Sequence, residues 1–168
     1  MKLNGDLTIN GKLVRAGQEI SWKSIYPFFL LHMLAFGGSG FFMAYHEPRP
    51  SVGFLYMHGG IAIAVYLMFY HSIFGREEVK WMWINAGLGI FGIYSEMNWL
   101  LSLFGKKVSS YPWYVHVIPF LYYVLYTFLL RQAVLDVTGS REDEARRKIV
   151  DRSYVALSLG AYTALHFL

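Results

Sequence analysis

Residues 54–74 read FLYMHGGIAIAVYLMFYHSIF, a stretch of 21 residues without a single Asp, Glu, Lys or Arg. Crossing the hydrocarbon core of a bilayer takes about 20 apolar helical residues. A buried helix of a soluble protein normally keeps a polar stripe, which this stretch lacks. The stretch therefore predicts a transmembrane helix.

Three further stretches have the same character. Residues 25–45 and 113–130 contain no Asp, Glu, Lys or Arg, and residues 81–104 contain one such side chain, Glu96. The five tryptophans lie at or near the ends of the predicted spans, as in the aromatic belts of membrane proteins. The pattern predicts an all-α membrane protein with a four-helix transmembrane bundle over residues 25–135.

The composition agrees with a membrane protein. Hydrophobic residues make up 55% of the 168-residue chain and charged residues only 15%, whereas soluble domains carry roughly 25% charged residues. The sequence contains no cysteine, which excludes a disulfide scaffold, a cysteine-ligated zinc site and thiol catalysis.

Residues 136–168 begin with a charged segment and end in an apolar one. Gly139 suits the end of the preceding helix, and the Ser-Arg-Glu-Asp sequence of residues 140–143 predicts the start of a charged helix. Three i,i+4 ion pairs in which the acidic residue precedes the basic one would stabilise this helix: Glu142–Arg146, Asp143–Arg147 and Glu144–Lys148. The apolar stretch that follows, residues 153–168, would measure about 24 Å as a helix. It either crosses the membrane as a short fifth helix, lies in the interface or packs beside its neighbours.

The polar segment of residues 1–24 is predicted to be cytoplasmic and to contain a β-hairpin. Residues 7–14 read LTINGKLV, and the Asn-Gly pair at their centre favours a type I′ turn. A lone two-stranded hairpin is marginal in water. We therefore expect it to dock on the loops of the bundle or to add to the sheet edge of a partner.

The positive charges indicate the orientation. With the N-terminus inside, 12 of the 15 Lys and Arg residues lie on the cytoplasmic side, and only Arg49, Lys106 and Lys107 lie on the other. The positive-inside rule therefore predicts an inner (plasma) membrane protein with a cytoplasmic N-terminus. Arg131 directly follows the fourth stretch, and we expect its stem to snorkel to the interface. The net charge of +4 thus reports orientation, and nucleic acid is not an expected partner.

The glycines are predicted to let helices approach closely. Residues 87–92 match the G-x-G-x-x-G pattern, but they lie in the middle of a predicted span and not after a strand, so a dinucleotide site is not indicated. Gly60 and Ala64 form a small-xxx-small pair suited to helix packing.

Five of the six histidines lie in or at the edge of the four stretches, where ionisable groups are functional hypotheses by default. By predicted depth, His71 pairs with His32 and His58 pairs with His46. Two facing helices that each carry two histidines form the arrangement expected in a protein with two stacked b-type haems, whose axial ligands are neutral imidazoles.

This arrangement resembles cytochrome b, in which each of two helices supplies ligands to both haems. The resemblance covers the four histidines and nearby glycines such as Gly38 and Gly60. It departs from cytochrome b because His58 and His71 are about 140° out of line on an ideal helix, and because His46 precedes Glu47-Pro48 at the membrane edge. It implies haem b held by His32, His46, His58 and His71. The alternative is that the histidines form hydrogen bonds between helices.

A second group of candidate residues lies in the outer half of the predicted bundle. His58 and His116 should lie at similar depth, and Glu96 about 12 Å in from the outer end of its span. A carboxylate in hydrocarbon has to be protonated, hydrogen-bonded, paired or facing water. His58, His116 and Glu96 are therefore candidate ligands of a transition metal. The alternative is a neutral hydrogen bond from Glu96 to a neighbouring helix.

Four functions are compatible with these features. Short loops, a hairpin that needs a partner and the lack of a catalytic motif favour a non-catalytic subunit, assembly factor or interaction module of a larger membrane complex, with other membrane subunits or a second copy as partners. The second function is a haem-binding or metal-binding redox protein. The third is an oligomeric channel or small transporter with Glu96 in a polar path. The fourth is a lipid-modifying enzyme with Glu96 and a histidine as acid and base.

Overall fold

The computed structural model of the chain describes residues 1–9 and 11–167, and it is mostly helical, as predicted. Its long helices are α1 (Trp22–Tyr45), α2 (Val52–Phe74), α4 (Trp81–Ser102), α5 (Val117–Val137) and α6 (Glu144–His166). Its short elements are strands β1 (Leu7–Ile9) and β2 (Lys12–Val14), helix α3 (Arg76–Val79) and the 3-10 turns η1 (Val108–Ser110) and η2 (Trp113–His116).

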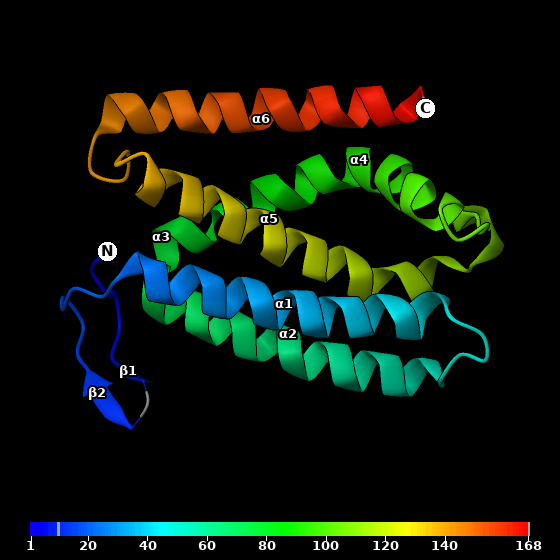
Figure 1. The fold of residues 1–168 in the computed structure, drawn as a ribbon, viewed down its shortest axis with the longest axis horizontal. Helices are drawn as coiled ribbons and strands as arrows, with labels where there is room; N and C mark the ends of the chain where they lie inside the picture. Colours follow the sequence, from blue (N-terminus) through cyan, green and yellow to red (C-terminus); the bar gives the residue numbers. More distant parts are fainter. Residues whose placement is uncertain (10, 168) are drawn as a thin grey trace.

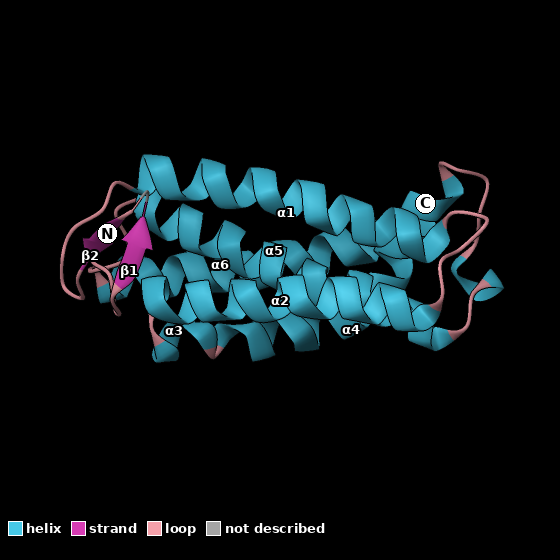
Figure 2. Cartoon of the chain, turned by 90° about the horizontal axis from the view of Figure 1, so that it is seen from below, coloured by secondary structure: helices cyan, strands magenta, loops and turns pink. Residues whose placement is uncertain are grey.

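The five long helices run along the longest axis of the molecule with α5 in the centre (Figure 1). Helix α5 packs against α1, α2 and α4, while α6 packs mainly against α4. Figure 2 shows the same alignment from below, with the hairpin at one end. We call the end with the hairpin, α3 and residues 138–143 the hairpin end. The end with residues 46–51 and 103–112 is the loop end.

Three helical segments are long and apolar enough to cross a membrane: Ile25–Tyr45, Val52–Phe74 and Trp113–Val137. Helix α4 has a comparable length but is less apolar, since it carries Asn85, Glu96 and Asn98. The membrane character of the bundle is therefore supported, whereas the predicted count of four spanning helices is not confirmed.

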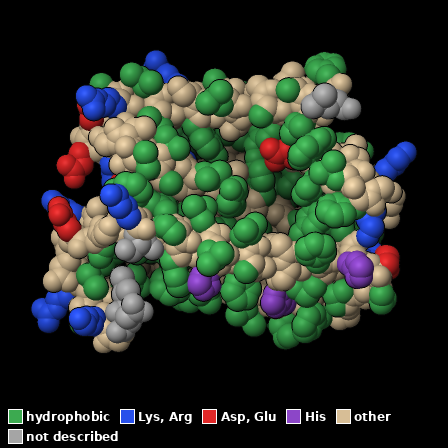
Figure 3. Space-filling model, in the orientation of Figure 1, with side chains coloured by type: hydrophobic (Ala, Val, Ile, Leu, Met, Phe, Trp, Pro, Cys, Tyr) green, Lys and Arg blue, Asp and Glu red, His purple; other side chains and the backbone are tan. Residues whose placement is uncertain are grey.

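On the face shown in Figure 3, most charged side chains lie toward the two ends of the bundle, and the band between them is rich in hydrophobic side chains and holds one acidic side chain. Exposed Leu31, Leu34 and Ile61 belong to this band, each with more than half of its surface accessible. Such an apolar belt between charged ends is the surface that a bilayer requires.

Glycines allow the closest helix contacts, as predicted. A Cβ atom at Gly59 would overlap the side chain of Ile118 on α5, and one at Gly92 would overlap the ring of Tyr162 on α6. Gly60 behaves differently, because nothing lies within 4 Å of the position where its Cβ would be. Within this chain Gly60 therefore meets no other helix, and the use of Gly60 and Ala64 in helix packing stays a prediction.

The hairpin is confirmed, and the segment before it docks on the bundle. Leu7 pairs with Val14 and Ile9 with Lys12 in antiparallel register, while Asn10 of the predicted turn lies outside the described residues. The backbone N–H groups of Asn4 and Gly5 donate to the carbonyl oxygen of Ser72 at 3.0 and 2.7 Å, near the end of α2. The hairpin itself projects beyond the layer of α1 and α2 (Figure 1).

The C-terminal segment forms one continuous helix, α6, which runs beside α4 from the hairpin end to the loop end (Figure 1). Its N-cap is Asp143, not Ser140, and the Asp143 carboxylate accepts from the backbone N–H groups of Ala145 and Arg146. Of the three predicted pairs, Glu144–Lys148 forms at 2.7 Å. The other two predictions are wrong for the described residues, because Arg146 pairs with Asp143 and Arg147 with Glu78.

Candidate functional site

A cluster of charged side chains closes the hairpin end of the bundle. Its centre is Arg131 on α5, which is fully buried. The guanidinium donates from Nη1 to Glu78 Oε2 and from Nε to Asp151 Oδ1, both at 2.8 Å, and lies 3.8 Å from the ring centroid of Trp81. The prediction that Arg131 snorkels to the interface is wrong, because α3 and α6 bring carboxylates to it inside the bundle.

Glu78 receives three side chains at the centre of this cluster. Gln132 Nε2 donates to Glu78 Oε2 at 2.9 Å, Arg131 donates to the same oxygen, and Arg147 pairs with Oε1. Burial alone would raise the pKa of Glu78. The hydrogen bonds from Gln132 and Arg131 and the charges of Arg131 and Arg147 outweigh burial, so the pKa is lowered. Glu78 is therefore ionised at neutral pH.

A second ion pair joins the cluster through Gln132. Arg141 Nε donates to Asp136 Oδ1 at 2.5 Å, and Tyr26 on α1 donates its hydroxyl to the same carboxylate. Arg141 also donates to Gln132 Oε1 at 2.8 Å. Burial opposes the charge of Arg141, but Asp136 outweighs burial and raises the pKa of the guanidinium. The charged cluster thus ties α1, α3, α5 and α6 together.

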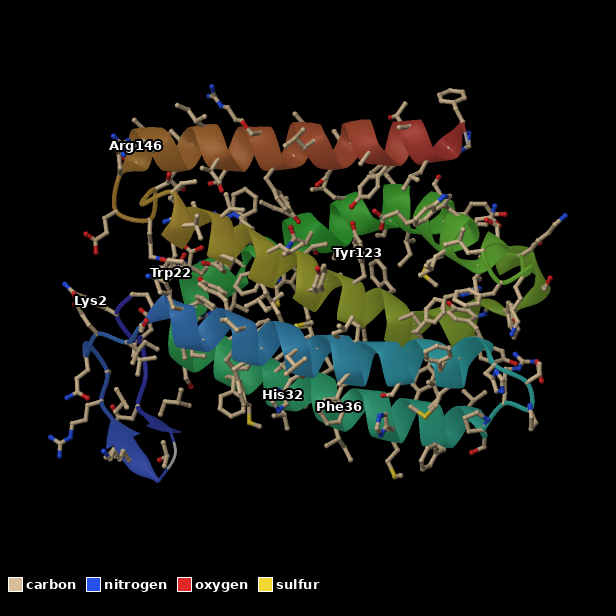
Figure 4. All side chains as sticks on the ribbon, viewed as in Figure 1. Lys2, Trp22, His32, Phe36, Tyr123 and Arg146 are labelled. Carbon is tan, nitrogen blue, oxygen red and sulfur yellow. The ribbon has the colours of Figure 1, made fainter. Side chains whose placement is uncertain are left out.

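A groove of about 410 Å³ between α1 and α2 contains two of the predicted haem ligands, His32 and His58. Figure 4 shows His32 and Phe36 along one side of α1, next to α2. The other walls are largely aromatic and include Phe28, Phe54 and Phe69. The structure thus brings two of the candidate histidines to one groove.

Local hydrogen bonds determine which imidazole nitrogens in the groove keep a lone pair that could bind a metal. His32 Nδ1 lies 2.9 Å from the carbonyl oxygen of Phe28, which can only accept, so Nδ1 donates and a neutral His32 keeps its lone pair on Nε2. Ser39 donates its hydroxyl to the carbonyl oxygen of Phe36. His58 Nε2, 3.3 Å from Ser39 Oγ, is then the donor of that pair. A neutral His58 therefore keeps a lone pair on Nδ1.

The four histidines do not form the two predicted pairs. The contact between His58 and Ser39 sets the register of α1 and α2, and His46 is about 10 Å farther along α1 than Ser39 at 1.5 Å per residue. By the same register His71 lies about 9 Å beyond the level of His32. Two axial nitrogens on one metal are only about 4 Å apart, twice a metal–nitrogen bond. Haem binding stays a prediction, but the structure does not bring these pairs to common levels.

The three candidate metal ligands lie on different parts of the bundle. His58 lines the groove between α1 and α2, whereas His116 Nδ1 forms a 2.7 Å hydrogen bond with Tyr45 Oη at the loop end. Glu96 is half-buried on α4, one turn beyond Gly92, whose face packs against α6. In residues 1–9 and 11–167 no three His, Asp or Glu side chains lie close enough to hold a metal ion.

Sequence reasoning missed the charged cluster. Glu78, Asp136 and Asp151 lie in segments that it treated as loops or solvated helix faces. One feature of the sequence could have indicated the cluster. The polar residues Arg131 and Gln132 end an apolar stretch at the same end of the bundle as these three carboxylates.

Comparison with known proteins identified no relative, since the chain matches no protein-family model, no curated protein and no solved structure.

Proposed function

We propose that this chain is a multi-pass inner-membrane protein with a cytoplasmic N-terminus, and that it acts as a non-catalytic subunit, assembly factor or interaction module of a larger membrane complex. In this proposal α4 and α6 cross the bilayer together with α1, α2 and α5. The distribution of Lys and Arg supports the orientation. The packing of α6 along α4 supports a fifth crossing.

The outward face of α2 is the observation that carries this proposal. Gly60 and Ala64 are both exposed, and no atom lies within 4 Å of the position where a Cβ of Gly60 would be. Small residues on a lipid-facing surface let the backbone of another helix approach closely. The adjacent Gly59 faces inward against Ile118, so this chain does not use the Gly60 face. We propose that a helix of another subunit, or of a second copy, packs there.

The hairpin supports the same function. In the described part of the chain, β1 and β2 pair only with each other, and Leu13 is 57% exposed. Unpaired strand edges that project from a protein are suited to adding a strand from a partner.

The double variant Gly60→Leu with Ala64→Leu tests the proposal. After gentle solubilisation, native mass spectrometry of the wild type should show a defined oligomer or copurifying membrane chains, and the double variant should lose them. Gly160→Leu on α6 is the matched control, because its Cβ would also meet open space. A wild type that is a lone monomer, or a control that dissociates equally, would count against the proposal.

A haem-binding or metal-binding redox function is the second candidate. It rests on single ligands, because neutral His32 and His58 each keep one lone pair on the aromatic groove but lie about 10 Å apart along α1. Protein expressed with haem and metals supplied should then show a Soret band or a bound metal that His32→Ala or His58→Ala removes. A colourless, metal-free preparation would exclude this candidate.

A further inference from the structure

A second cavity, of about 620 Å³, lies between the hairpin and the first turns of α1. Its polar wall consists of Lys12 on β2, Thr8 on β1 and Ser21 at the start of α1. The remaining lining residues are apolar and include Ile25 and Phe28. We call these three exposed polar side chains the polar mouth of the cavity and the apolar lining residues its apolar body.

The polar mouth is suited to an anion. Lys12 supplies a positive charge, and Thr8 and Ser21 supply two hydroxyl groups. Ser21 is the N-cap of α1, yet its side chain makes no capping hydrogen bond within the described residues, and the first turn of α1 carries no acidic residue. The first N–H groups of this 24-residue helix are thus not shielded by a negative side chain, and a helix N-terminus attracts anions.

The apolar body continues along the membrane-facing side of the bundle. Phe28, Phe29 and Phe69 line both this cavity and the groove between α1 and α2, so the two adjoin each other. The path from Ile25 to Phe36 is about 16 Å along α1, which is close to half of the 30 Å hydrocarbon core. In Figure 4 the hairpin, His32 and Phe36 lie on the same side of the molecule.

We infer that the cavity and the groove together bind an anionic phospholipid of the leaflet at the hairpin end. The phosphate lies at Lys12, Ser21 and the N-terminus of α1, and one acyl chain follows the aromatic wall toward Phe36. A soluble anion would leave the apolar groove uncovered, and a partner helix would not use the polar mouth. The excess of basic residues in residues 1–24 complements the headgroup: Lys2, Lys12, Arg15 and Lys23 against Asp6 and Glu19. The inference does not depend on the partner-docking face of α2.

Competition between two lipids tests the inference. The full-length protein is equilibrated with mixed micelles that contain equal amounts of phosphatidylglycerol and phosphatidylcholine, and the lipids retained are measured by native mass spectrometry. We expect the wild type to retain phosphatidylglycerol preferentially and Lys12→Gln to lose about fivefold of this preference, as for one lysine at an anionic membrane surface. Arg15→Gln is the matched control, since Arg15 is exposed on the same segment but does not line the cavity.

A second variant tests the apolar path. Val65→Trp places a large ring in the groove, and we expect it to lower the retention of both lipids. The inference is overturned by equal retention of the two lipids by the wild type, by equal effects of Lys12→Gln and Arg15→Gln, or by full retention in Val65→Trp. Displacement of the lipid by excess glycerol phosphate would also overturn it, because that result would assign the affinity to the headgroup alone.

Discussion

At the scale of single residues, the buried guanidinium of Arg131 is held by two carboxylates that are distant in sequence, Glu78 and Asp151. Arg131→Ala leaves both carboxylates without their central cation. Removing one partner of a buried ion pair costs about 3–5 kcal/mol, so we expect a loss of that size in the free energy of unfolding. Urea or SDS titration of the purified protein in detergent measures it.

Lys80→Ala provides the control for this experiment. Lys80 pairs with Glu77 at 2.8 Å, but both side chains are more than half exposed. Exposed pairs contribute at most about 1 kcal/mol. Equal losses for Arg131→Ala and Lys80→Ala would show that the charged cluster does not stabilise the hairpin end.

The lowered pKa of Glu78 predicts a dependence of stability on pH. A carboxyl whose pKa is lower in the folded state stabilises the fold above its unfolded pKa, about 4.3 for Glu, and this contribution is lost as the pH falls through the folded value. We therefore expect the melting temperature to decrease in acid, and Glu78→Gln to have a weaker acid dependence. Melting curves from neutral pH down to below the unfolded pKa of about 4.3 test this, and equal slopes for the two proteins in that acid range would refute it.

At the scale of elements, neighbouring glycines on α2 provide a matched pair. Gly59→Ala places a Cβ against Ile118 and should destabilise the α2–α5 contact by about 1–3 kcal/mol. Gly60→Ala meets no atom of this chain and should be neutral or slightly stabilising, since alanine favours helix over glycine. Thermal unfolding of the two variants in detergent makes the comparison. An equal loss for both would contradict this packing of α2.

The elements themselves could be predicted from the sequence wherever the signal is local. The apolar stretch of residues 54–74 predicts α2, and Asn-Gly predicts the turn between β1 and β2, because bilayer thickness and backbone sterics act on adjacent residues. The Glu144–Lys148 salt bridge of α6 could also be predicted from local spacing, but the partner of Arg147 could not. Arg147 is a suitable partner for Asp143 by spacing, but tertiary packing gives it the more buried carboxylate of Glu78.

At the scale of the whole molecule, the candidate site was predictable only in part. The histidines were singled out because polar groups within a bilayer are rare, and the structure places His32 and His58 on one groove, which is not a pairing that the sequence predicted. Their pairing depended on the register between α1 and α2, which no local pattern encodes. The histidine depths estimated from the ends of the spans differ from this register by about two helical turns, as the contact between His58 and Ser39 shows.

In the proposed topology the bundle crosses the membrane with its hairpin end in the cytoplasm and α6 as a crossing helix. The chain lacks cysteine, so single cysteines can be introduced and labelled in intact cells with a membrane-impermeant maleimide. Four exposed positions suit this experiment: Arg15 and Glu142 at the hairpin end, and Lys107 and Phe167 at the other end.

We predict that Lys107→Cys and Phe167→Cys are labelled in intact cells, and that Arg15→Cys and Glu142→Cys are labelled only after permeabilisation. Labelling of Phe167→Cys only after permeabilisation would show that α6 does not cross. Labelling of Arg15→Cys but not Lys107→Cys in intact cells would reverse the orientation. The same accessibility at all four positions would contradict a membrane-spanning bundle.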